Sequence, residues 1–465
     1  MLRDKYEADK VFLDISELLA LDLDPVLAQI DTLLDDDELF QLIRADLAKR
    51  YPRTTRTGRN STPVEVILRM LAVKRLYNFS YEDTERQVSD SLVLRRFCRV
   101  YLEPVPDDTT LIRWAGLIQP ATLERFNQRV TALATALKVT RGRKLRTDGT
   151  VVESNIHAPS DSSLLVDGVR VLGRTLTRAK AVLGEAAAEL GEAFRNRIRS
   201  ARRTARQIGE HVSRRRAAAQ ATAKKAYPRL VQTAQATIAQ VEQVLPALQA
   251  HATLEAQALA ATLETFGPRV EQVIEQTVRR VFPEEQVPAP EKIVSLFEPH
   301  TDILCRGKAQ RPVEYGHKVW LDEVDGGLIS AYRVLAGNPP DATQWAPSLA
   351  GHIAQFGQAP QQASADRGLY SPANEDLAEQ LGVVRVILPK PGYKTPERQQ
   401  HEKQPWFRRG RKWHAGVEGR ISVGKRAHGL RRCLDHGPRG FDKWVGWGVI
   451  AGNLAVIGRT VAARS

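Results

Sequence analysis

The stretch KLRTDGTVV, residues 144–152, decides how the chain is divided into helical and extended regions. Its alternating threonine and valine side chains are typical of a β-strand, and this strand carries an acid, Asp148. Residues 1 to about 140 instead repeat apolar side chains at the three- or four-residue spacing of helices. The chain therefore changes from a helical region to a mixed α/β region at this strand.

Extended segments return only after residue 311. A hairpin is expected over residues 315–334, because Asp325-Gly326 is a pair that favours a tight turn between two strands. A helix is expected next over 345–356, followed by a strand over 362–366 that ends on Asp366. The last expected elements are a helix over 374–381, a buried strand over 383–388 and a helix over 414–428 that carries Glu418.

Three acids lie on these expected elements: Asp148, Asp366 and Glu418. Carboxylates that converge from separate elements can bridge two divalent cations, and their hard oxygen atoms suit Mg²⁺ or Mn²⁺. Two bridged ions activate a water or a 3′-hydroxyl and stabilise the leaving oxygen of a phosphodiester. Each acid alone is a common surface residue, so the hypothesis depends on all three together.

The N-terminal region contains several short expected helices. Thr62 is expected to cap one of them, with Pro63 at the first helical position and Glu65 completing a capping box. Another helix is expected to begin at Ser80. The helices carry basic side chains, as a DNA-binding helix-turn-helix module does: Arg86, Arg95, Arg96, Arg99 and Arg113. A helical scaffold with solvated arginines explains the same spacing, so both interpretations stay open.

A long helical block separates the two extended regions. Apolar residues from Val169 to Leu190 follow the spacing of a coiled-coil seam. An arginine-dense, alanine-rich helix is then expected over 195–229, where Glu210 is the only acid. Such a run is usually a solvated face. Charge of one sign at this density repels itself, however, and this favours an anionic partner.

The composition points the same way. Lys and Arg number 68 against 54 Asp and Glu, a formal net charge of +14. This surplus indicates a polyanionic partner, nucleic acid before an anionic membrane, although a basic protein without such a partner explains the charge equally well. Three dispersed cysteines form no disulfide framework and fit a reducing cytosol. No signal peptide is expected, and the apolar stretch 445–457 is interpreted as a buried helix too short to cross a bilayer.

Five segments of the sequence resemble bacterial insertion-sequence transposases of the DDE superfamily. The similarity looks closest to the ISNCY group and extends to the IS4/IS5-type enzymes. The segments are RNSTPVEVILRMLAVKRLYNFSYEDTERQVSDS (59–91), LRTDGTVVESNIHAPSDSSLL (145–165), GKAQRPVEYGHKV (307–319), SADRGLYSPAN (364–374) and WHAGVEGRISVGKRAHGLRRC (413–433).

The resemblance implies that Asp148, Asp366 and Glu418 are the catalytic acids and hold two Mg²⁺ or Mn²⁺ ions. In the wider family the third acid lies in a Tyr-x2-Arg-x3-Glu-x6-Lys pattern. Glu418 and Lys425 match it, whereas Arg411 and His414 stand at the Tyr and Arg positions. Lys425, and His414 when protonated, are accordingly expected to bind DNA phosphate.

The fold class implied is an α/β RNase H-like catalytic core, split by an all-α insertion and preceded by an α-helical N-terminal domain. The N-terminal domain is expected over 1–140 and the first part of the core over 141–168. The arginine-rich insertion is expected over 169–300 and the remainder of the core over 301–465. In the insertion, Arg202, Arg203 and Arg206 are expected to bind DNA.

The function implied is a metal-dependent DNA transposase that binds, cuts and joins transposon ends. Its expected partners are the terminal inverted repeats and target DNA, without a membrane, in a homodimer or higher oligomer. The expected location is the bacterial cytoplasm, at the nucleoid. Inverted repeats on either side of the reading frame would support this function.

Two other functions stay open: a catalytically inactive DNA-binding relative of a transposase, and another nuclease with an RNase H fold.

Two further motifs give weaker indications of a functional site. Cys433 and His436, with His428 nearby, resemble half of a zinc site without a second cysteine pair. Ser154, His157 and Asp161 lie close together in the sequence, but a catalytic triad is assembled by the fold and not by sequence proximity.

Overall fold

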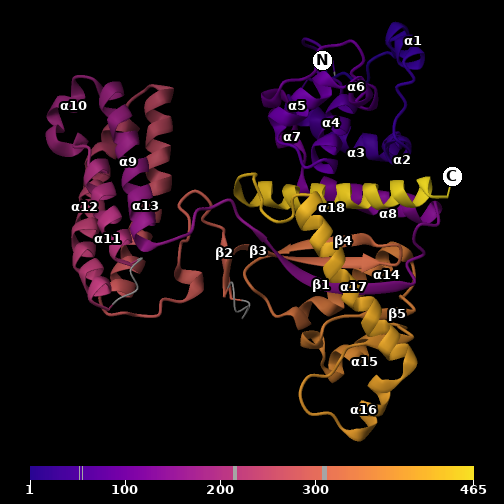
Figure 1. Cartoon of the computed structure of the whole chain (residues 1–465). Helices are drawn as coiled ribbons and strands as arrows, with labels where there is room; N and C mark the ends of the chain where they lie inside the picture. Colours follow the sequence, from indigo (N-terminus) through magenta and orange to yellow (C-terminus); the bar gives the residue numbers. More distant parts are fainter. Residues whose placement is uncertain (52, 55, 213–216, 306–311, 465) are drawn as a thin grey trace. The chain divides into compact units, whose positions relative to one another are not determined.

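The computed structural model describes residues 1–51, 53–54, 56–212, 217–305 and 312–464. It divides the chain into two compact units, Met1–Asn155 together with His317–Ser465, and Ile156–Gly316 (Figure 1). In sequence, the second unit lies between the two segments of the first. Of the features expected above, Arg214 to Arg216 and the first residues of the segment 307–319 lie outside the described residues.

The first unit is built around a mixed β-sheet. Its strands are β1 (Lys144–Glu153), β3 (Val313–Val324), β4 (Leu328–Leu335), β5 (Gln362–Ser364) and β6 (Arg385–Ile387), in the order β4-β3-β1-β5-β6 across the sheet. β3 and β4 are antiparallel, whereas β1, β5 and β6 run parallel. The strand β2 (Asp302–Cys305) pairs with residues 313–316 of β3, and both segments belong to the second unit.

The expected hairpin between β3 and β4 is confirmed, with its turn at Asp325-Gly326. The carboxylate of Asp325 accepts hydrogen bonds from the backbone amides of Arg141 at 2.9 Å and Lys144 at 3.1 Å. Gly326 has φ 86°, and a Cβ there would overlap the carbonyl oxygen of Val139. The turn thus fixes the segment that leads into β1.

Helices cover both faces of the sheet. On one face, Leu145 of β1 and Trp320 of β3 lie in one apolar cluster with Leu349 of α14 (Trp345–Phe356). On the other face, Val319 of β3 lies in a cluster with Val445 of α18 (Gly437–Ala462). The alternation of β3 side chains between two apolar layers explains why this strand contains almost no exposed residue.

Eight helices precede the sheet in the described residues of the first unit. They are α1 (Lys10–Leu18), α2 (Pro25–Leu34), α3 (Asp37–Leu47), α4 (Val64–Leu76), α5 (Tyr81–Asp90), α6 (Leu92–Phe97), α7 (Asp108–Leu117) and α8 (Pro120–Ala136). The helix start at Ser80 is confirmed, because its side chain accepts a hydrogen bond from the backbone amide of Asp83.

The expected capping box at Thr62 is wrong. α4 begins at Val64 after Pro63, and no side chain caps it. The backbone amides of Val64 and Glu65 instead donate to the carbonyl oxygens of Arg3 and Asp4, at 2.9 and 3.1 Å. A distant segment therefore satisfies the amides that a capping side chain would have satisfied.

The remaining helices of the first unit are α14, α15 (Pro372–Gln380), α16 (Pro396–Lys403), α17 (Pro405–Ala427) and α18. The helix carrying Glu418 begins at Pro405, not at His414, because a proline suits the first turn of a helix. α18 lies between the sheet and the N-terminal helices (Figure 1).

α18 is longer than the apolar stretch 445–457, so the expectation that it is too short to cross a bilayer is wrong. It alone, among the described residues, is long and apolar enough to do so by length and composition. Of its apolar window, however, 67% is buried inside the protein. Trp447, Ile450 and Leu454 lie in the same apolar core as the N-terminal helices, as in a core helix.

The second unit is mainly helical. Its helices are α9 (Asp161–Leu183), α10 (Ala186–Glu189), α11 (Ile198–Val212), α12 (Ala217–Ala250) and α13 (Leu254–Val281). The expected seam ends at Leu183, since Gly184 with φ 53° terminates α9. The arginine-dense stretch 195–229 is not a single helix either. α11 begins only at Ile198, and the helical residues of the stretch are divided between α11 and α12.

Candidate active site

The parallel register of β1 and β5 brings the two expected aspartates to neighbouring positions. Leu145 pairs with Ala363, and Arg146 pairs with Ser364. Asp148 and Asp366 each follow two residues later, so the same register, continued past the end of β5, sets them side by side. Neighbouring strands lie about 4.8 Å apart. Asp148 is half-buried, whereas the side chain of Asp366 is 67% exposed.

α17 crosses one face of the sheet, strand by strand. Gly410 contacts β6, because a Cβ there would lie 2.6 Å from Ile387. Further along the helix, Gly416 lies against β1, where a Cβ would be 2.6 Å from a guanidinium nitrogen of Arg146. Both glycines let the helix approach the sheet more closely than a larger side chain would allow. Side chains of β1 alternate, so Asp148 faces the same side as Arg146.

One flank of α17 carries the remaining candidate residues. His414, Glu418 and Lys425 fall within about 40° of one another around the helix axis, at about 100° per residue. His414 contacts Asp366 and Ser364, with its Nε2 3.2 Å from the Asp366 carboxylate and its Nδ1 3.4 Å from the Ser364 hydroxyl. This flank therefore points toward the end of the sheet where the aspartates lie. Glu418 is exposed and Lys425 is half-buried on it.

No group of three or more His, Cys, Asp or Glu side chains within the described residues lies close enough together to hold a metal ion. The register thus brings two of the three acids together, and Glu418 lies one helical turn beyond the His414 contact. The imidazole of His414 is only 11% exposed, so it shields one side of the otherwise exposed Asp366 carboxylate.

A buried ion pair fixes α17 against the sheet. The guanidinium of Arg146 donates to the carboxylate of Glu323 on β3, with Nε 2.8 Å from Oε2, and also to the backbone carbonyl of Trp413. It stacks on the Trp413 ring with 4.7 Å to the centroid. Glu323 is 1% exposed, so an uncompensated charge would result if Arg146 were removed.

A second polar cluster lies on the opposite face of β1. The hydroxyls of Thr147 and Ser348 donate to Asp322 at 2.7 and 2.6 Å, and Arg333 pairs with the same carboxylate at 2.9 Å. Trp320 donates its indole N–H to Ser348 at 3.0 Å. These contacts hold β1, β3 and α14 together and so stabilise the strand that carries Asp148.

Sequence reasoning missed Arg146, Asp322 and Glu323. A signal was present in VWLDEV, residues 319–324, where two acids interrupt an apolar strand. Buried carboxylates require partners. Their partners, however, lie far away in the sequence, and no local pattern identifies them.

Side chains of the weaker motifs contact other parts of the fold. The thiol of the buried Cys433 donates to the carbonyl of Asp435 at 3.3 Å, and His428 is buried, which lowers its pKa to about 4. His157 pairs with Asp167 at 2.7 Å, while Asp161 pairs with Arg280 at 3.0 Å. The zinc and triad interpretations therefore gain no support from these contacts.

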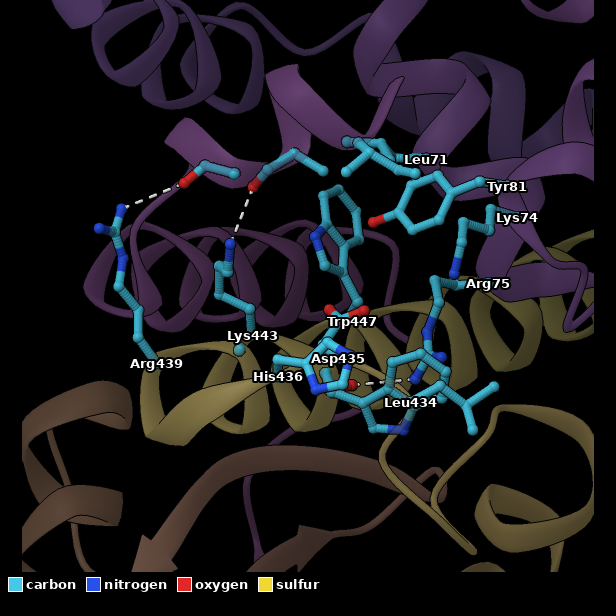
Figure 2. Close-up of a pocket in the computed structure, with 15 residues that line it drawn as sticks. Leu71, Lys74, Arg75, Tyr81, Leu434, Asp435, His436, Arg439, Lys443 and Trp447 are labelled. Atoms are coloured by element: carbon cyan, nitrogen blue, oxygen red, sulfur yellow. Dashed lines mark hydrogen bonds between the residues drawn. The ribbon is translucent and has the colours of Figure 1, made fainter. Parts of the chain in front are cut away.

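A cavity of about 450 Å³ lies between α4, α5, α7 and the start of α18 (Figure 2). Lys74 is 5% exposed, and burial lowers its pKa to about 8. Its ammonium lies 4.2 Å from the Tyr81 ring centroid and 5.1 Å from that of Trp444, and it forms no hydrogen bond or ion pair with any residue that the structure describes. The cavity thus holds a buried positive charge that lies against two aromatic rings, and the charge of Asp435 offsets its burial only in part.

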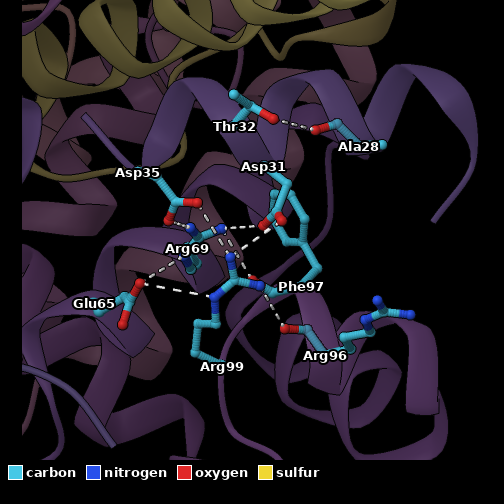
Figure 3. A network of polar contacts seen from close by, with 9 residues as sticks. All are labelled: Ala28, Asp31, Thr32, Asp35, Glu65, Arg69, Arg96, Phe97 and Arg99. Carbon is cyan, nitrogen blue, oxygen red and sulfur yellow. Dashed lines mark hydrogen bonds and ion pairs between the residues drawn. The ribbon is translucent and has the colours of Figure 1, made fainter. Parts of the chain in front are cut away.

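Buried ion pairs connect the N-terminal helices. Arg69 is fully buried and pairs with Asp31 at 2.6 Å, with Asp35 at 2.5 Å and with Glu65 at 3.4 Å (Figure 3). Arg99 adds contacts to Asp31 at 3.1 Å and to Asp35 at 3.4 Å. These guanidinium groups hold α2, α4 and the end of α6 together.

Most of the arginines expected to form a DNA-binding helix-turn-helix are engaged within the fold. Arg95 donates to the carbonyls of Tyr101 and Glu103, and Arg96 donates to that of Leu21. With Arg99 in the network of Figure 3, three of the five arginines support the scaffold interpretation.

This same helical region carries a family match. Residues 17–116 match the family model of the transposase domain DUF772. The match supports a transposase family for this chain. It indicates a role in transposition and a nucleic-acid-processing enzyme, and it covers α2 to α6 completely. Comparisons with curated proteins and with solved structures give no match.

Proposed function

We propose that the chain is a DDE-type transposase that cuts transposon ends and joins them to target DNA. The proposed catalytic residues are Asp148, Asp366 and Glu418. The observation that carries the proposal is the parallel register of β1 and β5, which brings Asp148 and Asp366 together from segments far apart in the sequence. The transposase-domain match at residues 17–116 supports it independently.

The sheet supports an RNase H-like core. A β-hairpin, β3 and β4, lies beside a central strand β1, which is followed by two strands parallel to it, β5 and β6. In a sheet of this kind, ligands are bound at the carboxyl ends of the parallel strands. Asp366 lies just past the carboxyl end of β5, and Asp148 lies on β1 two residues beyond the part of β1 that pairs with β5.

The chemistry of these donors suits two divalent cations, provided that Glu418 turns toward the aspartates. Two adjacent carboxylates repel each other without a cation between them, and their hard oxygens suit Mg²⁺ or Mn²⁺. Glu418 is exposed, so turning its carboxylate toward the aspartates costs little. When bound, the ions supply an activated water or 3′-hydroxyl and stabilise the leaving oxygen.

The protein's own residues position these acids. Arg146 and Glu323 hold α17 on the sheet, and the His414 imidazole orients the Asp366 carboxylate. Lys425 follows Glu418 by two turns on the same flank and is proposed to bind a DNA phosphate, as is protonated His414. Arg202, Arg203 and Arg206 of α11 are exposed, and we propose that this helix also meets DNA.

The proposed partners are the terminal inverted repeats of the element and target DNA. Joining two ends requires two catalytic cores, so the active species is proposed to be a homodimer or a higher oligomer at the bacterial nucleoid. The net charge of +14 favours such a polyanionic partner.

Asp148→Asn tests the proposal. We expect strand cleavage and joining to fall by at least about 100-fold in Mg²⁺, because the neutral amide no longer compensates the cation charge. DNA affinity stays within about twofold. The assay uses duplexes that carry the inverted repeats flanking the reading frame, one intact and one pre-cleaved, alongside an anisotropy titration. Asp376→Asn is the control, since it removes an equally negative but exposed side chain on α15.

The outcomes separate the alternatives. An Asp148→Asn variant that cuts and joins at the parental rate would falsify the two-metal assignment. A parental protein that binds the ends but cuts neither duplex in Mg²⁺ or Mn²⁺ is an inactive DNA-binding relative. Cleavage of intact duplex without joining of the pre-cleaved one identifies a nuclease of another kind.

A further inference from the structure

The second unit contains a cavity whose walls are lined with arginine. Its volume is about 780 Å³, and it lies between α9 and the start of α11. The polar residues that line it are Arg174, Thr177 and Arg178 of α9, Asn196 just before α11, and Arg199 and Arg202 of α11. The four arginines are exposed, and no acid lines the cavity.

Local packing directs these arginines into one space. Leu172 and Leu176 turn one face of α9 into the core, and Ala201 and Ile208 do the same for α11. Their arginines are therefore left on the sides of the helices that meet solvent. At about 100° per residue, Arg199 and Arg202 lie within about 60° of each other, on the flank next to α9.

Close contact between the two helices narrows the cavity. A Cβ at Gly173 of α9 would lie 3.2 Å from the side chain of Ile198, so the glycine permits this approach. Asn196 accepts a hydrogen bond from the Ile198 amide at 3.0 Å, which fixes the start of α11. Arg174 and Arg178 thus face Arg199 and Arg202 across a defined gap.

The four arginines of the cavity have no counter-charge among the described residues. Arg174, Arg178, Arg199 and Arg202 form no ion pair or hydrogen bond with any residue in the described ranges. Other arginines of the unit do: Arg170 with Asp167, Arg206 with Glu210, and Arg197 with Gln240, at 2.9, 3.0 and 3.3 Å. Four converging guanidinium groups without an acid repel one another, and a bound polyanion removes that repulsion.

We propose that this cavity binds the phosphate backbone of DNA. Arg174 and Arg178 are one turn apart, about 6 Å along α9, and Arg199 and Arg202 form a second such row on α11. Two rows of planar donor forks match a line of phosphates better than one small anion. The proposal deepens the proposed function, on which the choice of DNA rests, and it assigns phosphate binding to two α9 arginines.

The proposal also divides the arginines of α11. Arg203 follows Arg202 by about 100° around the helix and does not line the cavity. Arg206 is paired with Glu210. Among the three α11 residues expected from the sequence, Arg202 is therefore the one that contributes to this site.

The test measures the DNA affinity of the full chain as a function of salt concentration. A fluorescent 30-base-pair duplex of arbitrary sequence is titrated at several KCl concentrations. We compare a double variant, Arg174→Gln together with Arg178→Gln, to a control, Lys180→Gln together with Lys225→Gln. The control removes the same charge from exposed positions of α9 and α12, outside the cavity. Circular dichroism and thermal melting verify that both variants fold.

The cavity variant is expected to lower the slope of log K against log [KCl] by about 2, because each lost phosphate contact contributes about 0.9. Its affinity falls at least tenfold near 150 mM KCl, whereas the control changes the slope by less than about 0.5. Replacing the α9 pair with lysine restores most of the slope, since lysine keeps the charge, but only part of the affinity.

Equal slopes for the cavity and control variants overturn the proposal, because DNA then responds only to net charge. A second outcome overturns DNA as the occupant of the cavity. In it, the parental protein binds inorganic phosphate tightly at constant ionic strength, and the cavity variant keeps the parental slope for DNA. The readout is independent of catalysis. Asp148→Asn keeps the parental slope if the cavity binds DNA, and a chain that binds but does not cut refutes only the proposed function.

Discussion

Arginines of the two units lie in opposite surroundings. In the first unit, Arg69 and Arg99 are enclosed by Asp31, Asp35 and Glu65 (Figure 3). In the second unit, the arginines of the cavity between α9 and α11 meet no acid among the described residues. The same side chain therefore stabilises the fold in one place and is available to a ligand in the other. The difference lies in the partners, which a count of basic residues does not reveal.

Arg69→Met is the largest test of this comparison. We expect the free energy of unfolding of the first unit to fall by about 3–5 kcal/mol, because three carboxylates lose the fully buried guanidinium that compensates them. Urea unfolding followed by tryptophan fluorescence measures the change.

The control is Arg86→Met, whose pair with Asp83 is exposed and should contribute less than about 1 kcal/mol. If both variants lose the same stability, the buried network has no structural role beyond that of a surface pair.

Lys74 sharpens the comparison, because it is a buried cation of the first unit that forms no ion pair among the described residues, and Asp435 offsets its burial only in part. The unfolded chain holds its proton up to about pH 10.5, whereas the folded chain releases it near pH 8. Folding is therefore penalised below pH 8, and stability rises with pH between these two values.

Lys74→Met should remove that penalty and stabilise the first unit by about 3 kcal/mol at pH 6–7. The gain should shrink from pH 8 upward and vanish near pH 10.5. Urea unfolding at a series of pH values measures it, with the exposed Lys403→Met as control. A gain that does not change with pH would show that apolar packing, and not charge burial, is responsible.

The smallest effect is expected in the second unit. Changing Arg174 and Arg178 to Gln should alter thermal stability by less than about 0.5 kcal/mol, since both side chains are exposed and unpaired within the described residues. Differential scanning calorimetry without DNA measures this. A loss above about 2 kcal/mol would mean that these arginines serve the fold, as Arg69 does.

The sequence predicts elements well where local chemistry determines them. Ser80 caps its helix because the hydroxyl and the amide it satisfies are three residues apart, and Asp325-Gly326 turns because glycine tolerates positive φ. It fails where the partner is distant. The amides of Val64 and Glu65 are satisfied by a segment near the chain start, which no capping pattern reveals.

The candidate site follows the same rule. The sequence pattern indicates Asp148 and Asp366 because each lies on or just after a strand, whereas the register that brings them together is visible only in the sheet. Arg146 and Glu323, separated by 177 residues, were not identified at all. The metal ligands, the DNA contacts and the RNase H-like assignment stay predictions.

The position of α18 has a consequence for the order in which the protein becomes able to fold. Arg75 of α4 is fully enclosed and donates to the carbonyl oxygens of His428 and Trp444, the latter 369 residues further along the chain. At 5–20 residues per second, a ribosome needs roughly 20–70 s to make that stretch. During this interval the growing chain already contains α4, but a guanidinium and an apolar face of its N-terminal helices still lack their partners. Helices released this early are natural clients for a chaperone.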